Sequence, residues 1–314
     1  MIARHAAVRA EFMRPVVLTA SLAGFLTIAG RLEPGFIAGA TQLELATQVF
    51  ETALLAVPMT LVLISGGIDL SIGATMALSS AAFGMSFESG APIWACAACA
   101  ILAATCAGAF NGACVVRLAV HPLIVTLATL SLFRGVAEGI SRGRPVSGFP
   151  ESFTELGDAR WFGVPPAGWG FALAWAAALI WQRRTRGGRW ITAIGWNETA
   201  ARFSGVPVDR IKLLLYTLCG TAAGAAAVLF IARRNTAKAD IGLGIELEVI
   251  TAVVLGGTSA SGGRGSLLGT LLGLALLHEV RQFISWRWNN DELILLVVGA
   301  MLIGSMLLNR TKAS

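Results

Sequence analysis

The stretch Gly66-Gly67-Ile68-Asp69-Leu70-Ser71-Ile72-Gly73 places a carboxylate and a hydroxyl among glycines, between two long apolar runs. One run extends from Leu54 to Ile64 and the other from Ala74 to Phe87. An ionisable residue beside apolar segments of membrane length is costly, so it usually has a partner or a function. Glycines permit sharp turns and close backbone approach, which helix ends beside a transport route require. The stretch predicts membrane helices joined by a tight polar turn.

Composition supports a membrane protein. The chain has 314 residues, of which 55% are hydrophobic and 13% are charged, whereas soluble domains carry about 25% charged residues. Its apolar residues fall in blocks of about 17–25, the length of helix that crosses a bilayer. We therefore expect an all-α polytopic membrane protein with a single transmembrane domain over residues 1–314. The net charge of +6 is expected to mark cytoplasmic loops rather than a nucleic-acid partner.

The apolar blocks predict about ten membrane helices joined by glycine-rich turns. The first is expected to be retained rather than cleaved as a secretory signal, because more spans follow. The eighth is short for a span, so it is expected to be broken or partly re-entrant. The expected helices are Val16–Gly30, Leu43–Ile64, Asp69–Phe87, Ile93–Val116, Leu123–Ile140, Ala167–Trp181, Leu213–Ala232, Glu248–Thr258, Ser266–Phe283 and Glu292–Leu308.

Basic residues set the expected orientation. The segment of about residues 183–212 is rich in arginine and should lie in the cytoplasm, since cytoplasmic loops carry an excess of basic residues. With ten spans, both termini fall on the same side as this segment. The tail carries Arg310 and Lys312, which agrees. The basic residues Arg233, Arg234 and Lys238 would face outward and argue weakly against this topology.

Two glycine-rich turns are the candidate gate. Asp69 opens the third expected helix, so it is either an N-cap or a residue that lines or gates a route, and the two roles are compatible. The pattern Gly66-Gly67-x-x-x-Ser71-x-Gly73 recurs as Gly256-Gly257-x-x-x-Ser261-x-Gly263, which is either an internal repeat or independent use of glycine. The candidates for the translocation pathway or gate are Asp69, Ser71, Gly66, Gly67, Gly256, Gly257 and Ser261.

Small residues four apart predict close helix contacts, although 36 glycines also produce such spacings by chance. Asn111 is a polar group in an apolar run and is expected to hydrogen-bond across helices. Arg134 and Glu138 are four apart and are expected to pair on one helix face. Glu51 lies alone in the second helix without an obvious partner. The expected packing residues are Gly108, Asn111, Gly112, Gly265, Gly269 and Gly273, and the spacing also includes Gly220 and Gly224.

Nothing in the sequence predicts catalysis or a bound cofactor. The run Gly262–Ser266 lacks the lysine and the spacing of a phosphate-binding loop, so any ATPase must be another chain. Cys96-x-x-Cys99 has no second ligand pair at zinc spacing, and no metal site is expected.

A short helix is expected outside the bilayer after Gly195-Trp196. Asn197 is a credible N-cap, Glu198 suits the first turn, and Gly205 followed by Pro207 ends the element. This helix either lies on anionic lipid or docks a cytoplasmic partner.

Together these residues resemble the permease subunit of bacterial sugar ABC importers, the ribose-permease-type family. The resemblance spans nearly the whole chain and is carried by Gly66–Gly73, Asn111-Gly112, Pro122–Leu127, Arg134-Gly135, Ala193–Gly205 and Val253–Gly265.

The resemblance implies a ten-helix inner-membrane subunit that pairs with a second permease, identical or related. It further implies an ATPase partner that holds ATP and magnesium, a periplasmic sugar-binding protein, and a coupling helix. Trp196 departs from the small residue usual beside that helix. The residues expected to couple to the ATPase are Asn197, Glu198, Ala201, Arg202, Ser204 and Gly205.

The expected function is translocation of a monosaccharide, a pentose, hexose or deoxyhexose, by alternating access driven by the separate ATPase. One alternative is the same machinery carrying a branched-chain amino acid or a nucleoside. An ion-coupled secondary transporter is a second alternative, and it would need intramembrane acids that only Glu51 and Asp69 supply.

Overall fold

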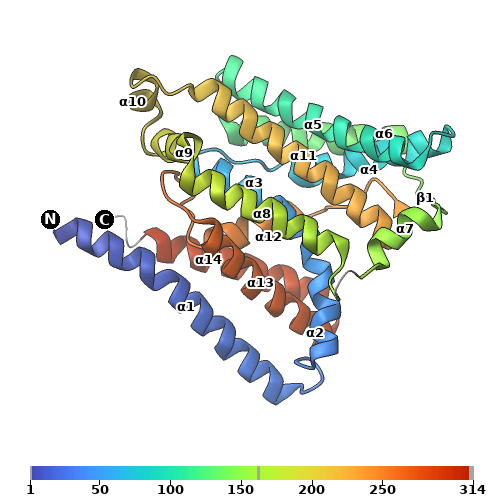
Figure 1. Ribbon diagram of the computed structural model, residues 1–314, viewed down its shortest axis with the longest axis horizontal. Coiled ribbons are helices and arrows are strands. Elements are labelled where there is room, and N and C mark those ends of the chain that lie inside the picture. The colour runs from blue at the N-terminus through green and yellow to red at the C-terminus, as the bar shows by residue number, and fades with distance from the viewer. Residues whose placement is uncertain (1, 161–162, 311–314) are drawn as a thin grey trace.

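The computed structural model describes residues 2–160 and 163–310, so Lys312 lies outside the described residues. Within these ranges the chain is an elongated bundle of helices (Figure 1). The helices are α1 Ile2–Leu32, α2 Gly39–Ala46, η1 Thr47–Val49, α3 Phe50–Ile64, α4 Ile72–Glu88, α5 Ile93–Arg117, α6 Pro122–Ser141, α7 Glu151–Asp158, α8 Pro166–Arg184, α9 Arg186–Trp196, α10 Glu198–Phe203, α11 Val208–Arg234, α12 Ile245–Leu255, α13 Leu267–Trp288 and α14 Asp291–Arg310.

Among the described residues, six helical stretches are long and apolar enough to cross a bilayer. They are Pro15–Leu32, Gly39–Ile64, Ile93–Arg117, Pro122–Ser141, Val208–Arg234 and Leu267–Trp288. The other four expected segments are also helices, namely α4, α8, α12 and α14. The prediction of an all-α polytopic membrane protein is confirmed, while the count of about ten spans stays a prediction.

The elements differ from expectation at several helix boundaries and in one ribbon. The second expected helix is α2 and α3 joined by the single 3-10 turn η1. The third begins at Ile72 instead of Asp69. A two-stranded antiparallel ribbon, β1 Val146–Ser147 paired with β2 Thr236–Ala237, was not expected at all. Strands of two residues are too short to carry the alternating pattern that would reveal them.

The centre of the bundle is α3, whose side chains are buried on nearly every face. A helix that is apolar all round is expected in such a central place. Its neighbours α8, α11, α12 and α13 surround it, and α4 and α5 pack beyond α11. The turn that follows α3 therefore lies inside the molecule, where the ends of several helices meet.

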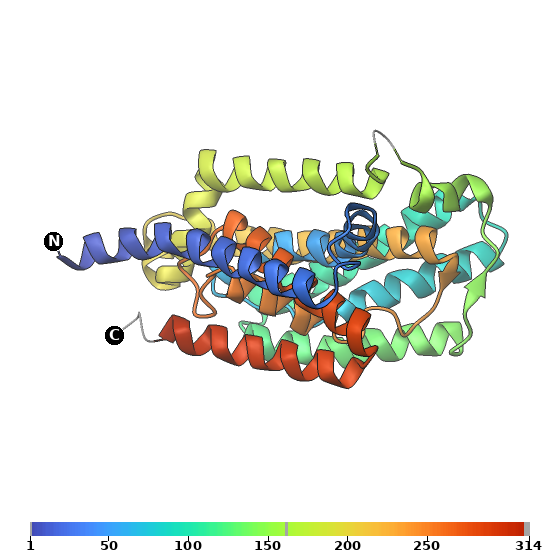
Figure 2. The same cartoon turned by 90° about the horizontal axis from the view of Figure 1, so that it is seen from below.

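Different elements form the two ends of the elongated molecule. The start of α1, the end of α14 and the short helix α10 lie at one end, while α7 and β1 lie at the other (Figures 1 and 2). This arrangement agrees with the expectation that the termini and the arginine-rich segment lie on one side of a membrane.

Candidate functional site

A directed hydrogen-bond chain occupies the turn between α3 and α4. Asn111 Nδ2 of α5 donates to Ser71 Oγ at 2.7 Å, and Ser71 Oγ donates to Asp69 Oδ1 at 2.6 Å. Asp69 Oδ1 also accepts from the backbone N–H of Ser71 at 3.0 Å. All three residues are 2% exposed or less. Both bonds to the Asp69 carboxylate come from Ser71, so the carboxylate closes the turn. The bond from Asn111 to Ser71 fastens the turn to α5.

The N-cap interpretation of Asp69 is wrong in its geometry. Helix α4 starts at Ile72 with Ser71 as its N-cap residue, and the Ser71 side chain makes no capping bond. Asp69 lies before the cap and closes a local turn instead. This is the usual competition between a short acidic side chain and helical backbone bonding.

Three backbone segments meet beside this turn. The N–H of Gly263 donates to the carbonyl of Ile64 at 2.8 Å. A Cβ added at Gly195 would lie 1.9 Å from Ile64 O and 2.3 Å from Gly263 N. A Cβ at Gly262 would lie 2.8 Å from Gly66 Cα. We call this meeting point of Gly66, Gly195, Gly262 and Gly263 the glycine junction. A side chain at Gly195 or Gly262 would collide with the backbone of another segment.

The two similar glycine motifs end their helices in the same way, one residue out of register. Gly66 N–H bonds to Leu63 O and Gly67 N–H to Val62 O, while Gly257 N–H bonds to Val254 O and Thr258 N–H to Val253 O. Gly66 and Gly257 have φ values of +79° and +94°, where glycine is favoured. In the structure Gly66 therefore corresponds to Gly257 rather than to Gly256.

Glycines also line two close helix contacts. A Cβ at Gly108 of α5 would lie 2.9 Å from Gly220 Cα of α11, and Gly112 faces the backbone of Leu213. On the other side of the bundle, Gly269 and Gly273 of α13 lie against Gly256, at the end of α12. Gly265 lies against Ile64 and Thr258. The small residues let the backbones touch, which strengthens dispersion contacts between helices in lipid.

The short helix α10 is held by its own charges. Asn197 Oδ1 accepts from Ala200 N–H at 2.9 Å, as an N-cap does. Arg202 pairs with Asp209 at 2.6 Å, and Lys212 pairs with Glu198 at 2.5 Å, so α10 is tied to the start of α11. The hydrogen bonds that Arg202 donates to Asp209 raise the pKa of Arg202 above its ordinary value, and the guanidinium stays charged.

Not every predicted coupling residue faces outward. Ala201 is 5% exposed and packs α10 onto the rest of the molecule, so it presents no surface to a partner. Ser204 Oγ donates to Ala200 O at 2.9 Å and helps end α10. Gly205 takes a φ of +80° after the helix, which a side chain would strain.

Two aromatic residues lie at the ends of this region. The sequence analysis did not select Phe203, the last residue of α10, and it noted Trp196, just before α10, as a departure from the family pattern. Phe203 is 90% exposed, an unusual position for a large apolar side chain. Trp196 covers Gly263 and stacks on Arg264, whose guanidinium carbon lies 4.7 Å from the ring centroid. The large residue at position 196 is thus accommodated by Arg264. Phe203 is the one large apolar residue of the six-residue helix α10, and this feature of the sequence could have indicated an exposed aromatic side chain.

A tyrosine links α11 to the polar turn. Tyr216 is 2% exposed, and its hydroxyl donates to Ile68 O at 3.2 Å. It lies four residues after Lys212, which pairs with α10. The first turns of α11 therefore contact α10 at one point and the Asp69 turn at another, while Gly195 at the end of α9 contacts the same turn through the glycine junction.

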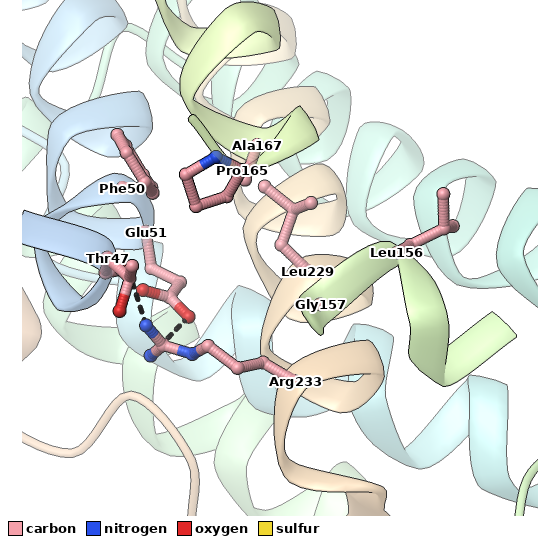
Figure 3. Close-up of a pocket in the computed structure, with 9 residues that line it drawn as sticks. All are labelled: Thr47, Phe50, Glu51, Leu156, Gly157, Pro165, Ala167, Leu229 and Arg233. Carbon is pink, nitrogen blue, oxygen red and sulfur yellow. Dashed lines mark hydrogen bonds and ion pairs between the residues drawn. The ribbon is translucent and has the colours of Figure 1, made fainter. Parts of the chain in front are cut away.

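Glu51 has a partner, contrary to the sequence-based expectation. Its carboxylate pairs with Arg233 of α11 at 2.7 Å, and Arg233 Nη1 donates to Thr47 O at 2.5 Å. The pair lies in a small pocket between α3, α7 and α11, where Gly157 of α7 lies against the Arg233 backbone (Figure 3). Arg233 thus neutralises a buried carboxylate. This pairing explains why one of the three basic residues that argued against the expected orientation lies in this segment.

One predicted contact is not formed, and one candidate pathway residue lies outside the buried cluster. Arg134 does not pair with Glu138, because its Nη1 donates to the carbonyls of Ala239 and Ile241 instead. Ser261 is exposed, and its N–H bonds to Ser259 Oγ, so it lies apart from the buried Asp69 cluster. The described residues hold no group of histidine, cysteine, aspartate or glutamate able to bind a metal ion.

The fold is that of a multi-helix membrane protein. The family model described as "Branched-chain amino acid transport system / permease component" matches residues 42–306. The chain therefore belongs to that permease family, and it is a non-catalytic permease component rather than an enzyme.

Curated relatives agree with this assignment. Ribose import permease protein RbsC of Escherichia coli strain K12 is 39% identical over 258 residues, which cover 80% of this chain and 80% of that protein. Autoinducer 2 import system permease protein LsrD of Photorhabdus luminescens is 34% identical over 256 residues, covering 80% of this chain and 77% of that protein. No solved structure matches the chain. The predicted resemblance to sugar importer permeases is confirmed.

Proposed function

We propose that this chain is the permease subunit of an ATP-binding-cassette importer and translocates a pentose-like monosaccharide across the bacterial inner membrane. The observation that carries the mechanism is the link from exposed α10 through α11 and Gly195 to the glycine junction. The identity of 39% with a ribose import permease supports the solute class. We expect about ten spans, with surrounding lipid and both termini on the cytoplasmic side with α10.

The partners follow from this function. An ATPase subunit that holds ATP and magnesium docks on α10, a periplasmic sugar-binding protein delivers the solute at the opposite end, and a second permease completes the route. Phe203 is the anchor for the ATPase, since aromatic residues in pockets dominate interface energies. Arg202 has a different role from the one expected: it holds α10 in place through Asp209.

The proposed motion is alternating access. ATP binding in the partner moves α10, and the Glu198–Lys212 pair and Gly195 carry the displacement into the turn after α3. Gly66 and Gly257 act as hinges, because their φ values lie in the left-handed region that glycine adopts without strain. Their neighbours Gly67 and Gly256 move with them. Asp69 and Ser71 act by keeping the turn rigid rather than by contacting solute, since both are buried.

One alternative solute has a specific observation in its favour. The matching family model is described by branched-chain amino acid transport. Such a solute would use the same machinery with another binding protein. An ion-coupled transporter is disfavoured, because Glu51 is occupied by Arg233 and Asp69 by Ser71.

The test is ATP turnover by the complex purified with its co-encoded ATPase and binding protein. Ribose is expected to stimulate turnover, with leucine as the comparison solute. Stimulation by leucine and not by ribose would replace the sugar assignment with the amino-acid one, and loss of turnover on omitting the ATPase is the control for the passive role of this chain.

A further inference from the structure

The segment of residues 238–244, between β2 and α12, forms turns without helix or strand. Its residues alternate in exposure. Ala239 and Ile241 are 6% and 3% exposed, whereas the Asp240 side chain is 57% exposed and Leu243 is 70% exposed. One side of the segment therefore packs into the bundle and the other side stays open.

Three contacts fix the inner side. The N–H of Lys238 donates to Ser80 Oγ of α4 at 3.0 Å. Arg134 Nη1 of α6 donates to Ala239 O at 2.6 Å and to Ile241 O at 2.8 Å. Gly242 lies against Gly73 of α4, where a Cβ at either glycine would lie within 2.9 Å of the other's carbonyl oxygen. The segment is therefore clamped between α4 and α6, with one guanidinium holding two of its carbonyls.

Arg134 sets the depth of these contacts. It lies twelve residues after Pro122 and seven before Ser141, inside the candidate span Pro122–Ser141. At 1.5 Å per residue this is about 18 Å and 10 Å from the helix ends. Irregular backbone at membrane depth is tolerated only where it is buried in protein or lines a water-filled cavity. The open side of the segment is not buried by this chain, so it faces either a second subunit or water.

We propose that the 238–244 segment is a wall of the water-filled solute route and that Arg134 is the positioning residue that holds this wall. The proposal rests on the permease function proposed above. Water is favoured over a subunit contact because the open side carries Lys238 and Asp240, paired at 3.1 Å and 44% and 57% exposed. Charged residues are depleted from the centres of protein interfaces. The pair offers a donor and an acceptor for the hydroxyls of a neutral sugar.

Cysteine labelling tests the wall. In the assembled complex, in right-side-out membrane vesicles, a functional chain whose five native cysteines are replaced receives Leu243→Cys. The probe is a charged, membrane-impermeant methanethiosulfonate. The control is Leu132→Cys, which is on α6 near Arg134 and 51% exposed. Leu243→Cys is expected to react at least about tenfold faster than the control, because a charged reagent is strongly excluded from lipid.

Two results would overturn the wall. One is labelling of Leu243→Cys no faster than that of Leu132→Cys. The other is efficient cross-linking of two Leu243→Cys copies by a short bifunctional reagent without reaction with the charged probe, which would make the segment a subunit contact.

Variants of Arg134 test the positioning role. Arg134→Gln is expected to lower the maximal rate of ribose uptake about tenfold, the equivalent of one lost hydrogen bond to a charged group, with KM little changed. It is also expected to change the labelling rate at Leu243→Cys. Arg134→Lys should restore part of both, and exposed Arg144→Gln is the matched control. Wild-type uptake and labelling in Arg134→Gln would refute the role.

Failure of this proposal is distinguishable from failure of the proposed function. Labelling needs no knowledge of the solute, so a fast reaction at Leu243→Cys without any sugar-stimulated ATP turnover would leave the wall standing and remove the sugar assignment. Sugar-stimulated ATP turnover together with equal labelling of Leu243→Cys and Leu132→Cys would leave the sugar assignment standing and remove the wall.

Discussion

At the scale of single residues, the sequence singled out polar side chains that are buried in the structure, but not all of the partners that they bind. Asp69, Ser71 and Asn111 were all selected as polar groups in apolar surroundings, and the structure joins them by hydrogen bonds. Glu51 seemed unpaired because its partner Arg233 is 182 positions away along the chain. Local spacing detects neighbours on one helix, but a partner on another helix depends on tertiary packing.

Asp69→Asn is expected to impair transport more than folding. The amide oxygen still accepts from Ser71, so the turn keeps its shape, but the charge-assisted bond weakens. Uptake should fall while the amount of protein in the membrane stays close to wild type. Asp69→Ala is the comparison, since it removes the acceptor for the Ser71 hydroxyl and N–H and costs about 1–3 kcal/mol of stability. Loss of Asp69→Asn from the membrane would show a purely structural residue.

Breaking the Glu51–Arg233 pair is expected to be severe. Glu51 is buried, and removing one partner of a buried ion pair costs about 3–5 kcal/mol. Glu51→Ala should therefore lower the thermal unfolding temperature of the detergent-solubilised complex. Arg287→Ala is the control, because its pair with Glu33 is largely exposed and worth about 1 kcal/mol or less. Equal shifts in the two variants would contradict the buried-pair account.

At the scale of elements, the glycine patterns predicted turns and close helix contacts but not their arrangement. All ten expected apolar segments are helical, because long apolar blocks are the strongest sequence signal for a helix in lipid. The meeting of Gly195 with Gly263 was not predicted, since it brings the end of α9 to the end of α3 and to the loop between α12 and α13. Only the folded arrangement reveals why both positions lack a side chain.

Gly195→Ala is expected to uncouple transport from ATP hydrolysis. Its Cβ would lie 1.9 Å from Ile64 O, so the glycine junction must open and the Gly263–Ile64 hydrogen bond at 2.8 Å must lengthen or break. We expect retained basal ATP turnover by the complex with reduced ribose uptake. Gly170→Ala on α8 is the matched control, because nothing lies within 4 Å of an added Cβ there. Wild-type uptake in Gly195→Ala would contradict the junction's role.

At the scale of the whole molecule, the structure places α10, the start of α1 and the end of α14 at one end, away from α7 and the ribbon (Figure 1). The arginine-rich segment predicted this grouping through its charge. The sequence analysis did not select Phe203, because its 90% exposure depends on how α10 packs against the rest of the molecule.

Phe203→Ala is expected to weaken binding of the ATPase subunit by about 2 kcal/mol, in the range of an aromatic hot spot, or roughly thirtyfold. Co-purification and a titration of the ATPase against the permease in detergent measure this. Thr199→Ala, also exposed on α10, is the control. Unchanged affinity in Phe203→Ala would remove the residue from the docking surface.

The central claim is that this chain is a passive route driven from outside through α10. The most direct measurement is ribose accumulation by proteoliposomes containing the permease, with the binding protein outside, ATP inside, and the ATPase subunit either present or omitted. The account predicts accumulation only when the ATPase is present, and its loss when Gly195→Ala replaces the wild-type chain. Accumulation or ATP hydrolysis by the permease chain alone would contradict it.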